Sequence, residues 1–122
     1  MRKFIFDQIK FRELVLYIAN RSQSDPLFGV VKLNKILYYS DFAAYRILGH
    51  PITGASYQKF NEGPAPQEML GQRRVMVDSG DITVRNRPYF SGVQQCIVPL
   101  RQADTEMFTH EELSIVDGVI EG

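Results

Sequence analysis

The chain has a single cysteine and no long apolar run. Cys96 alone cannot form an intrachain disulfide or build a cysteine zinc cage, so we expect it to be a small buried hydrophobe. Apolar runs extend for only a few residues, well short of the ~20 needed to cross a bilayer. The apolar stretch that begins at Phe4 stops at Asp7, so the core of a signal peptide does not develop. These absences predict a cytoplasmic protein with no membrane partner.

Residues arranged for catalysis are also scarce. The two histidines, His50 and His110, have no carboxylate at the spacing of an HExxH metal site, and neither a Walker loop nor a GxSxG elbow is present. Asp41 lies in the apolar middle of a predicted helix, where we expect a hydrogen-bonded structural acid; a general base is the alternative. We therefore expect no enzyme activity, no catalytic residue, no cofactor and no metal.

The charges cancel over the whole chain but are unevenly distributed. Residues 1–60 hold nine Lys and Arg against four Asp and Glu, whereas residues 61–122 hold five against ten. This asymmetry can guide association with a charged partner, and a solvated surface is the alternative. Nucleic-acid binding through Lys32, Lys35 and Arg46 is a second alternative, which the neutral total and the absence of a dense basic patch disfavour.

Two amphipathic helices are predicted in the first half of the chain. One covers about residues 7–22, and a longer one runs from about Val30 to Leu48 and ends at Gly49, with Pro51 preventing its continuation. The long helix carries two apolar stripes, so we expect a central helix that is buried on more than one side. The first stripe contains Val30, Leu33, Leu37, Ala44 and Leu48, and the second contains Ile36, Tyr39, Ala43 and Ile47.

The second half mixes strands and helices. We predict a short strand within residues 52–60, a rigid loop over 61–66, a helix over 66–78, and a hairpin of strands near 81–87 and 93–101. Thr109 and Glu112 form a capping box that begins a last helix. The fold class is α+β: one mainly helical domain over residues 1–122 with a small β-hairpin or sheet.

Three segments resemble the Panacea domain of SocA-like antitoxins. Residues 32–42, KLNKILYYSDF, are similar to that family's KLxKLLYYADF helix. The likeness continues through Gly49, residues 51–55 and Tyr57, and residues 63–66, GPAP, are similar to a GPVP-like element. Residues 108–117, FTHEELSIVD, are similar to FSxEELxxID. The resemblance covers about residues 8–120; it departs at residues 61–62, where the family often has an aromatic or aliphatic residue before Tyr or Lys.

The resemblance implies an antitoxin that neutralises a cognate toxin protein by direct binding. It also implies a role as a proteolytic adaptor for an AAA+ protease, and a prophage accessory protein without a toxin is an alternative. Panacea domains usually continue beyond the equivalent of Gly122. We therefore expect a chain that is either naturally short or C-terminally truncated. A missing segment would leave an apolar groove uncovered, and that groove can pair two copies into a homodimer or receive a partner.

We predict that the partner-binding surface lies in the segment after the long helix. It joins the aromatic and cationic residues Tyr57, Lys59 and Phe60 to the loop Asn61, Glu62, Gly63 and Pro64. Tyrosine suits interfaces because it combines a large apolar face with a hydroxyl, and a stiff Gly-Pro loop loses little entropy on docking. The last helix is expected to dock near the hairpin through Leu113, Val116 and Ile120, with Glu111, Asp117 and Glu121 facing outward.

Overall fold

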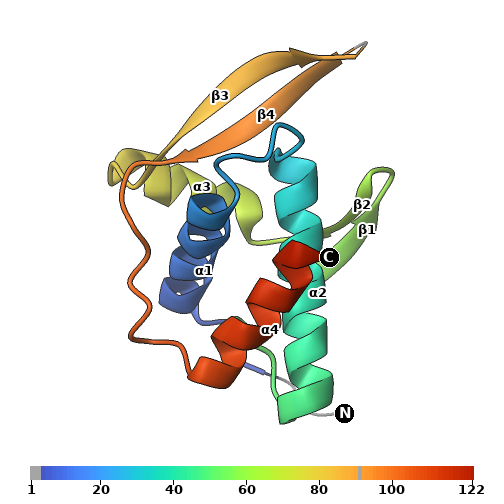
Figure 1. The fold of residues 1–122 in the computed structure, drawn as a ribbon, viewed down its shortest axis with the longest axis vertical. Coiled ribbons are helices and arrows are strands. Elements are labelled where there is room, and N and C mark those ends of the chain that lie inside the picture. The colour runs from blue at the N-terminus through green and yellow to red at the C-terminus, as the bar shows by residue number, and fades with distance from the viewer. Residues whose placement is uncertain (1–3, 91) are drawn as a thin grey trace.

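The computed structural model describes residues 4–90 and 92–122, the side chain of Tyr89 excepted. Within them lie helices α1 (Gln8–Arg21), α2 (Val30–Leu48), α3 (Met69–Asp78) and α4 (His110–Glu121). Strands β1 (Tyr57–Phe60) and β2 (Gly63–Pro66) form one antiparallel pair, and β3 (Ile82–Tyr89) and β4 (Gly92–Pro99) form another. Figure 1 shows α1, α2 and α4 packed together, with the β3–β4 pair crossing one end and the β1–β2 pair beside α2. The α+β prediction is confirmed.

Both early helices begin and end where the sequence predicts. The Asp7 carboxylate accepts a hydrogen bond of 3.0 Å from the Lys10 amide and so caps α1. Gly49 ends α2 in the left-handed region, at φ 85°, which a residue with a Cβ rarely adopts. These caps explain why the boundaries of α1 and α2 could be read from local chemistry alone.

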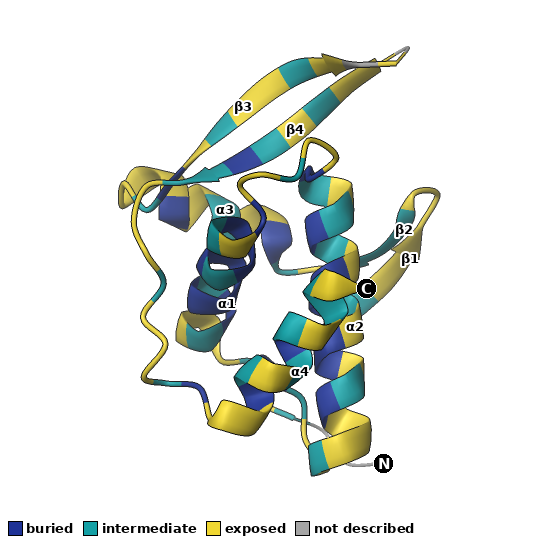
Figure 2. Cartoon of the chain, viewed as in Figure 1, coloured by how far each residue is buried: buried dark blue, intermediate teal, exposed yellow. Residues whose placement is uncertain are grey.

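The core lies between α1, α2 and α4, where Figure 2 shows the buried residues facing one another. Leu33, Leu37 and Ala44 have no exposed surface, as the first predicted stripe of α2 requires. The second stripe was wrong in part: Ile36 is buried, but Tyr39 and Ile47 are more than half exposed. Tyr39 lies on the outer, exposed side of α2, whereas Ile47 borders an open hollow between the end of α2 and the start of α4.

Residues 57–66 form a hairpin instead of a strand followed by a loop. Tyr57 pairs with Pro66 and Phe60 with Gly63, so that Asn61 and Glu62 make the turn. The prediction that Pro66 opens the next helix was wrong, because Pro66 completes β2 and α3 begins only at Met69. Proline fits a strand where its nitrogen points away from the partner strand, and the alternation of the ladder gives Pro66 that position.

The second hairpin is confirmed and is slightly longer toward its turn than predicted. Eight consecutive pairs run from Ile82 with Pro99 to Tyr89 with Gly92. Its base is anchored in the core by Ile82 and Ile97, which are buried. The far end extends away from the helices as an arm (Figure 1).

The capping box of α4 is confirmed, but its docking site differs from the prediction. Thr109 Oγ1 accepts from the Glu112 amide at 3.1 Å, and a Glu112 carboxylate oxygen accepts from the Thr109 amide at 2.9 Å. The helix packs on α2 and α1 and not near the hairpin. Val116 is fully buried there, while the buried Glu112 carboxylate meets Lys10 Nζ at 2.8 Å. Asp117 faces α1 instead of solvent, because it accepts from Arg21 at 2.7 Å.

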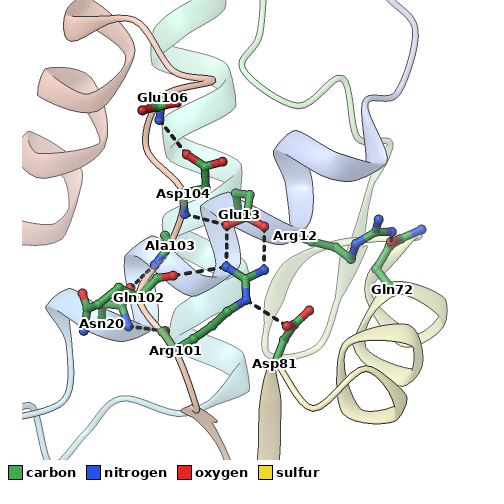
Figure 3. A network of polar contacts seen from close by, with 10 residues as sticks. All are labelled: Arg12, Glu13, Asn20, Gln72, Asp81, Arg101, Gln102, Ala103, Asp104 and Glu106. Carbon is green, nitrogen blue, oxygen red and sulfur yellow. Dashed lines mark hydrogen bonds and ion pairs between the residues drawn. The ribbon is translucent and has the colours of Figure 1, made fainter.

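A polar clamp holds the segment between β4 and α4, which has no helix or strand of its own. The Arg101 guanidinium donates to both carboxylate oxygens of Glu13, at 3.0 and 2.7 Å, and to Asp81 at 2.8 Å. Glu13 also accepts from the Asp104 amide at 2.7 Å (Figure 3). The Asn20 side chain donates to the Arg101 carbonyl oxygen and accepts from the Ala103 amide. Hydrogen bonds from side chains of α1 thereby hold this segment, in place of the backbone hydrogen bonds of a sheet.

Candidate protein-interaction surface

The outer side of α2 carries a row of exposed aromatic rings. Tyr39 is 52% exposed, and Phe42 and Tyr45 are each 48% exposed. Their spacing of three and six residues places them on one side of the helix, together with half-buried Tyr38. We call this surface the aromatic face; it consists of Lys35, Tyr38, Tyr39, Phe42, Tyr45 and Arg46.

Contacts between rings hold the aromatic face in a fixed arrangement. Tyr38 lies at its centre, with ring centroids 5.2 Å from Tyr39, 6.1 Å from Phe42 and 5.3 Å from Tyr57. The Tyr38 and Phe42 rings are stacked, and the guanidinium of Arg46 lies 6.0 Å from the Phe42 centroid. A surface whose side chains are already ordered loses less entropy when a partner binds.

Asp41 anchors the hairpin to α2 from within. One carboxylate oxygen accepts from the amides of Ile52 and Thr53, both at 2.8 Å. The other accepts from the hydroxyls of Thr53 at 2.5 Å and Tyr57 at 2.6 Å. The prediction of a hydrogen-bonded structural acid is therefore confirmed. Burial, with the neighbouring Asp41 charge and hydrogen bond, raises the pKa of the Tyr57 hydroxyl well above its usual value.

The predicted partner-binding residues all lie on the β1–β2 hairpin, but they divide by exposure. Lys59, Phe60, Asn61 and Glu62 are exposed at its free end. Gly63 and Pro64 are half-buried, and an added side chain at Gly63 would meet Lys35 at 2.9 Å. Tyr57 is also half-buried, and its hydroxyl is occupied by Asp41. Tyr57 thus connects the hairpin to the aromatic face through its ring contact with Tyr38.

The hairpin separates the aromatic face from a groove of about 410 Å³. Strand side chains alternate, so Tyr57 and Lys59 project on one face, while Gln58 and Phe60 project on the other and line the groove. Residues of α2, β1, β2, α3 and β4 and of the segment between β2 and α3 surround this space. They are Val30, Asn34, Gln58, Phe60, Ala65, Pro66, Gln67, Met69, Leu70, Arg73 and Gln95.

A second hollow, of about 450 Å³, lies where the end of α2 meets the start of α4. Ile47, Leu48 and Ile115 supply its apolar lining, and His110 and Glu111 also border it. His50 and His110 are both exposed. Over residues 4–90 and 92–122, no three His, Cys, Asp or Glu side chains are grouped to hold a metal ion. None of the helices described is long and apolar enough to span a bilayer.

The sequence reasoning missed the aromatic face because it assigned Tyr39 to the core. A signal was present: Tyr38, Phe42 and Tyr45 recur at intervals of four and three residues, alongside Lys35 and Arg46. A stripe that mixes tyrosines with cations is more typical of an interface than of an interior, which is depleted in lysine and arginine.

A protein-family model described as the antitoxin SocA-like, Panacea domain matches residues 33–122, well over half of the chain. The match begins within α2 and includes the aromatic face, both hairpins and α4. No curated protein and no solved structure matches the chain.

Proposed function

The chain belongs to the family of SocA-like Panacea antitoxin domains, and from this premise we propose that it neutralises a cognate toxin by binding it directly. The proposed contact surface joins the aromatic face of α2 to the free end of the β1–β2 hairpin. On the hairpin, Lys59, Phe60, Asn61 and Glu62 supply the exposed contacts, while Tyr57, Gly63 and Pro64 hold the hairpin in place.

The exposed rings of α2 are the observation that supports this proposal. Interfaces are enriched in tyrosine, phenylalanine and arginine, and a few such residues provide most of the binding energy. Tyr39, Phe42 and Arg46 combine these residue types on one side of one helix. Large apolar side chains exposed together mark a site of association more often than single ones do.

We propose that the chain acts by binding alone and catalyses no reaction. The Asp41 carboxylate, which is the buried acid nearest the aromatic face, already accepts four hydrogen bonds. A carboxylate so engaged is poorly placed to act as a general base. The nucleic-acid alternative relied on Lys32, Lys35 and Arg46, and Lys32 is bound to Asp25 at 2.5 Å.

Delivery of the bound toxin to an AAA+ protease in the cytoplasm is a further part of the proposal, which the family resemblance supports. The β3–β4 pair crosses one end of the helical body, and its far end projects beyond the helices (Figure 1); we propose this arm as the part that remains accessible when a toxin is bound on α2. Toxin half-life in cells with and without the protease tests this step. A half-life that the antitoxin does not shorten would contradict it.

The central experiment is co-purification of this chain with the product of the adjacent reading frame, a protein lethal alone and harmless with the antitoxin. In the Tyr39→Ala and Phe42→Ala variants, we expect binding to weaken by about 2 kcal/mol for each ring that acts as a hot spot. Lys59→Glu should weaken it further by reversing the charge beside the rings. Val77→Ala, at an exposed apolar position on α3, is the control and should bind normally.

Thermal melts must first show that each variant is folded. Tyr57→Ala is a poor test, because it removes a hydrogen bond from buried Asp41 and so disturbs the fold itself. Undiminished toxin binding by a folded variant that carries Tyr39→Ala, Phe42→Ala and Lys59→Glu together would contradict the proposed surface. A gel shift of the promoter DNA by the chain alone would favour the nucleic-acid alternative.

A further inference from the structure

The groove on the other side of the β1–β2 hairpin has a lining of unusual chemistry. Three glutamines, at positions 58, 67 and 95, and one asparagine, Asn34, supply most of its polar groups. Arg73 is the one ionisable residue among the described residues that line it. Phe60 and Leu70 are half exposed or more and provide apolar contact area at its margin. Each amide side chain can both donate and accept a hydrogen bond, as a peptide backbone does.

Among the residues described, this lining contains one buried polar side-chain atom without a hydrogen-bond partner. The side-chain oxygen of Asn34 is buried and accepts no hydrogen bond from the described part of the chain. Buried acceptors are nearly always satisfied, so an exception indicates a group that awaits a donor. An N–H group of a bound segment would supply that donor.

Charge determines which kind of segment fits. Arg73 donates one long hydrogen bond of 3.3 Å, to Gln95, and forms no ion pair within residues 4–90 and 92–122. No carboxylate is present in the part of the groove lining that the structure describes. Arg74 follows on α3 and is exposed. The surroundings therefore favour an anion, and Arg73 can bind a carboxylate through two parallel hydrogen bonds.

We propose that this groove binds an extended, acidic peptide segment of a partner protein. The segment lies between the β1–β2 hairpin and β4 and donates a backbone N–H to Asn34. It places a carboxylate on Arg73 and an apolar side chain between Phe60 and Leu70. A single cation among the lining residues neutralises too little phosphate for nucleic acid, and the apolar margin suits protein better. The proposed toxin surface shares Phe60 with this groove but does not include Arg73 or Leu70, so substitutions at those two residues test the groove separately.

The test uses the intact chain as bait for a display library of linear peptides about twelve residues long. We expect the selected peptides to contain Asp or Glu next to an apolar residue. Fluorescence anisotropy of a selected peptide should show roughly tenfold weaker binding to Arg73→Glu. Arg74→Glu is the matched control: it makes the same charge change one position along α3 at a residue that does not line the groove, and we expect a much smaller loss. Leu70→Ser, at an exposed site, gives a second variant if Arg73→Glu does not fold.

Several results would overturn the proposal. Selected peptides without acidic residues, or equal losses in Arg73→Glu and Arg74→Glu, would show that the groove is not the site. Binding of a single-stranded oligonucleotide that Arg73→Glu abolishes would assign the groove to nucleic acid. Light scattering that shows self-association, lost in Leu70→Ser, would assign it to a second copy of the chain. An Arg73→Glu variant that still binds the toxin agrees with the proposal. A wild-type chain that binds no toxin at all contradicts only the function proposed above.

Discussion

Around Arg101, polar groups from α1, from Asp81 and from the segment after β4 bind one another, whereas along the outer side of α2 the aromatic rings meet chiefly each other. The Glu13 carboxylate accepts from Arg101 twice and from the Asp104 amide once. Tyr39, by contrast, is exposed and touches its neighbour Tyr38. One region has its hydrogen-bonding capacity filled, and the other leaves apolar area available to a partner. Stability and binding should therefore respond to different substitutions.

The largest expected effect lies on the inner side of α2. Leu37 has no exposed surface and packs in the core, so Leu37→Ala removes buried apolar atoms and leaves a cavity. We expect the free energy of unfolding to fall by about 2–5 kcal/mol. Urea denaturation measures it. An unchanged midpoint would mean that α2 is turned differently, and the assignment of its outer face would fail with it.

Breaking the clamp at Arg101 should have the next largest effect. Arg101→Met leaves the nearly buried Glu13 carboxylate without its guanidinium. Removing one partner of a fully buried pair costs roughly 3–5 kcal/mol. The Arg101 side chain is 39% exposed, so we expect a smaller loss of about 2 kcal/mol. Toxin binding by the folded variant should be normal. A binding defect as large as that of Tyr39→Ala would contradict the expectation that stability and binding depend on different regions.

Acid should weaken the clamp at Arg101. Burial raises the pKa of Glu13, but the hydrogen bonds from Arg101 and the Asp104 amide outweigh it, so the pKa lies below its usual value. A carboxyl whose pKa is lowered in the folded state stabilises the protein above its unfolded pKa, and that contribution is lost as pH falls through the folded one.

Urea denaturation of the wild-type chain and Arg101→Met, at about pH 7 and about pH 3, measures this contribution. We expect the difference in unfolding free energy between them to shrink at the lower pH. A constant difference would show that Arg101 stabilises the chain through packing alone.

The smallest expected effect is an increase in stability, from a substitution at Ser40. Ser40 is fully buried in α2, and its hydroxyl has no hydrogen-bond partner among the residues described. Ser40→Ala removes an unsatisfied polar group and raises helix propensity, so we expect an increase in stability of about 1 kcal/mol. A higher melting temperature by calorimetry would support this. A loss of stability would indicate that the hydroxyl bonds a backbone carbonyl of α2, a contact frequent for serine in helices.

Local chemistry explains which parts of the fold were predictable from the sequence. Gly49 and the capping box at Thr109 are signals that act within one turn of helix, and the helix ends they predict are confirmed. The turn-rich segment between the two strands of the β3–β4 hairpin is also a local signal. The family resemblance, read from residues 32–42 and two later segments, is confirmed by the family match.

The errors arise where tertiary packing decides. Periodicity shows that α2 has apolar stripes, but not which of them has a neighbour, so Tyr39 was placed in the core. The docking of α4 depends on the pairing of Glu112 with Lys10, about a hundred residues earlier in the sequence. Residues 61–66 look like a loop because prolines rarely occur in strands. Only the pairing of residues 63–66 with β1 makes that part a strand. The partner-binding surface remains a prediction.

The two prolines of β2 have a consequence for how the free protein behaves at high concentration. Lys59 with Pro64 and Tyr57 with Pro66 alternate with the pairs that exchange hydrogen bonds, so both proline nitrogens point away from β1. A strand from another molecule needs N–H donors along the edge that it joins, and at these two positions β2 has none. At these two positions the edge therefore cannot template the addition of a further strand, which protects the free protein from amyloid-like stacking there.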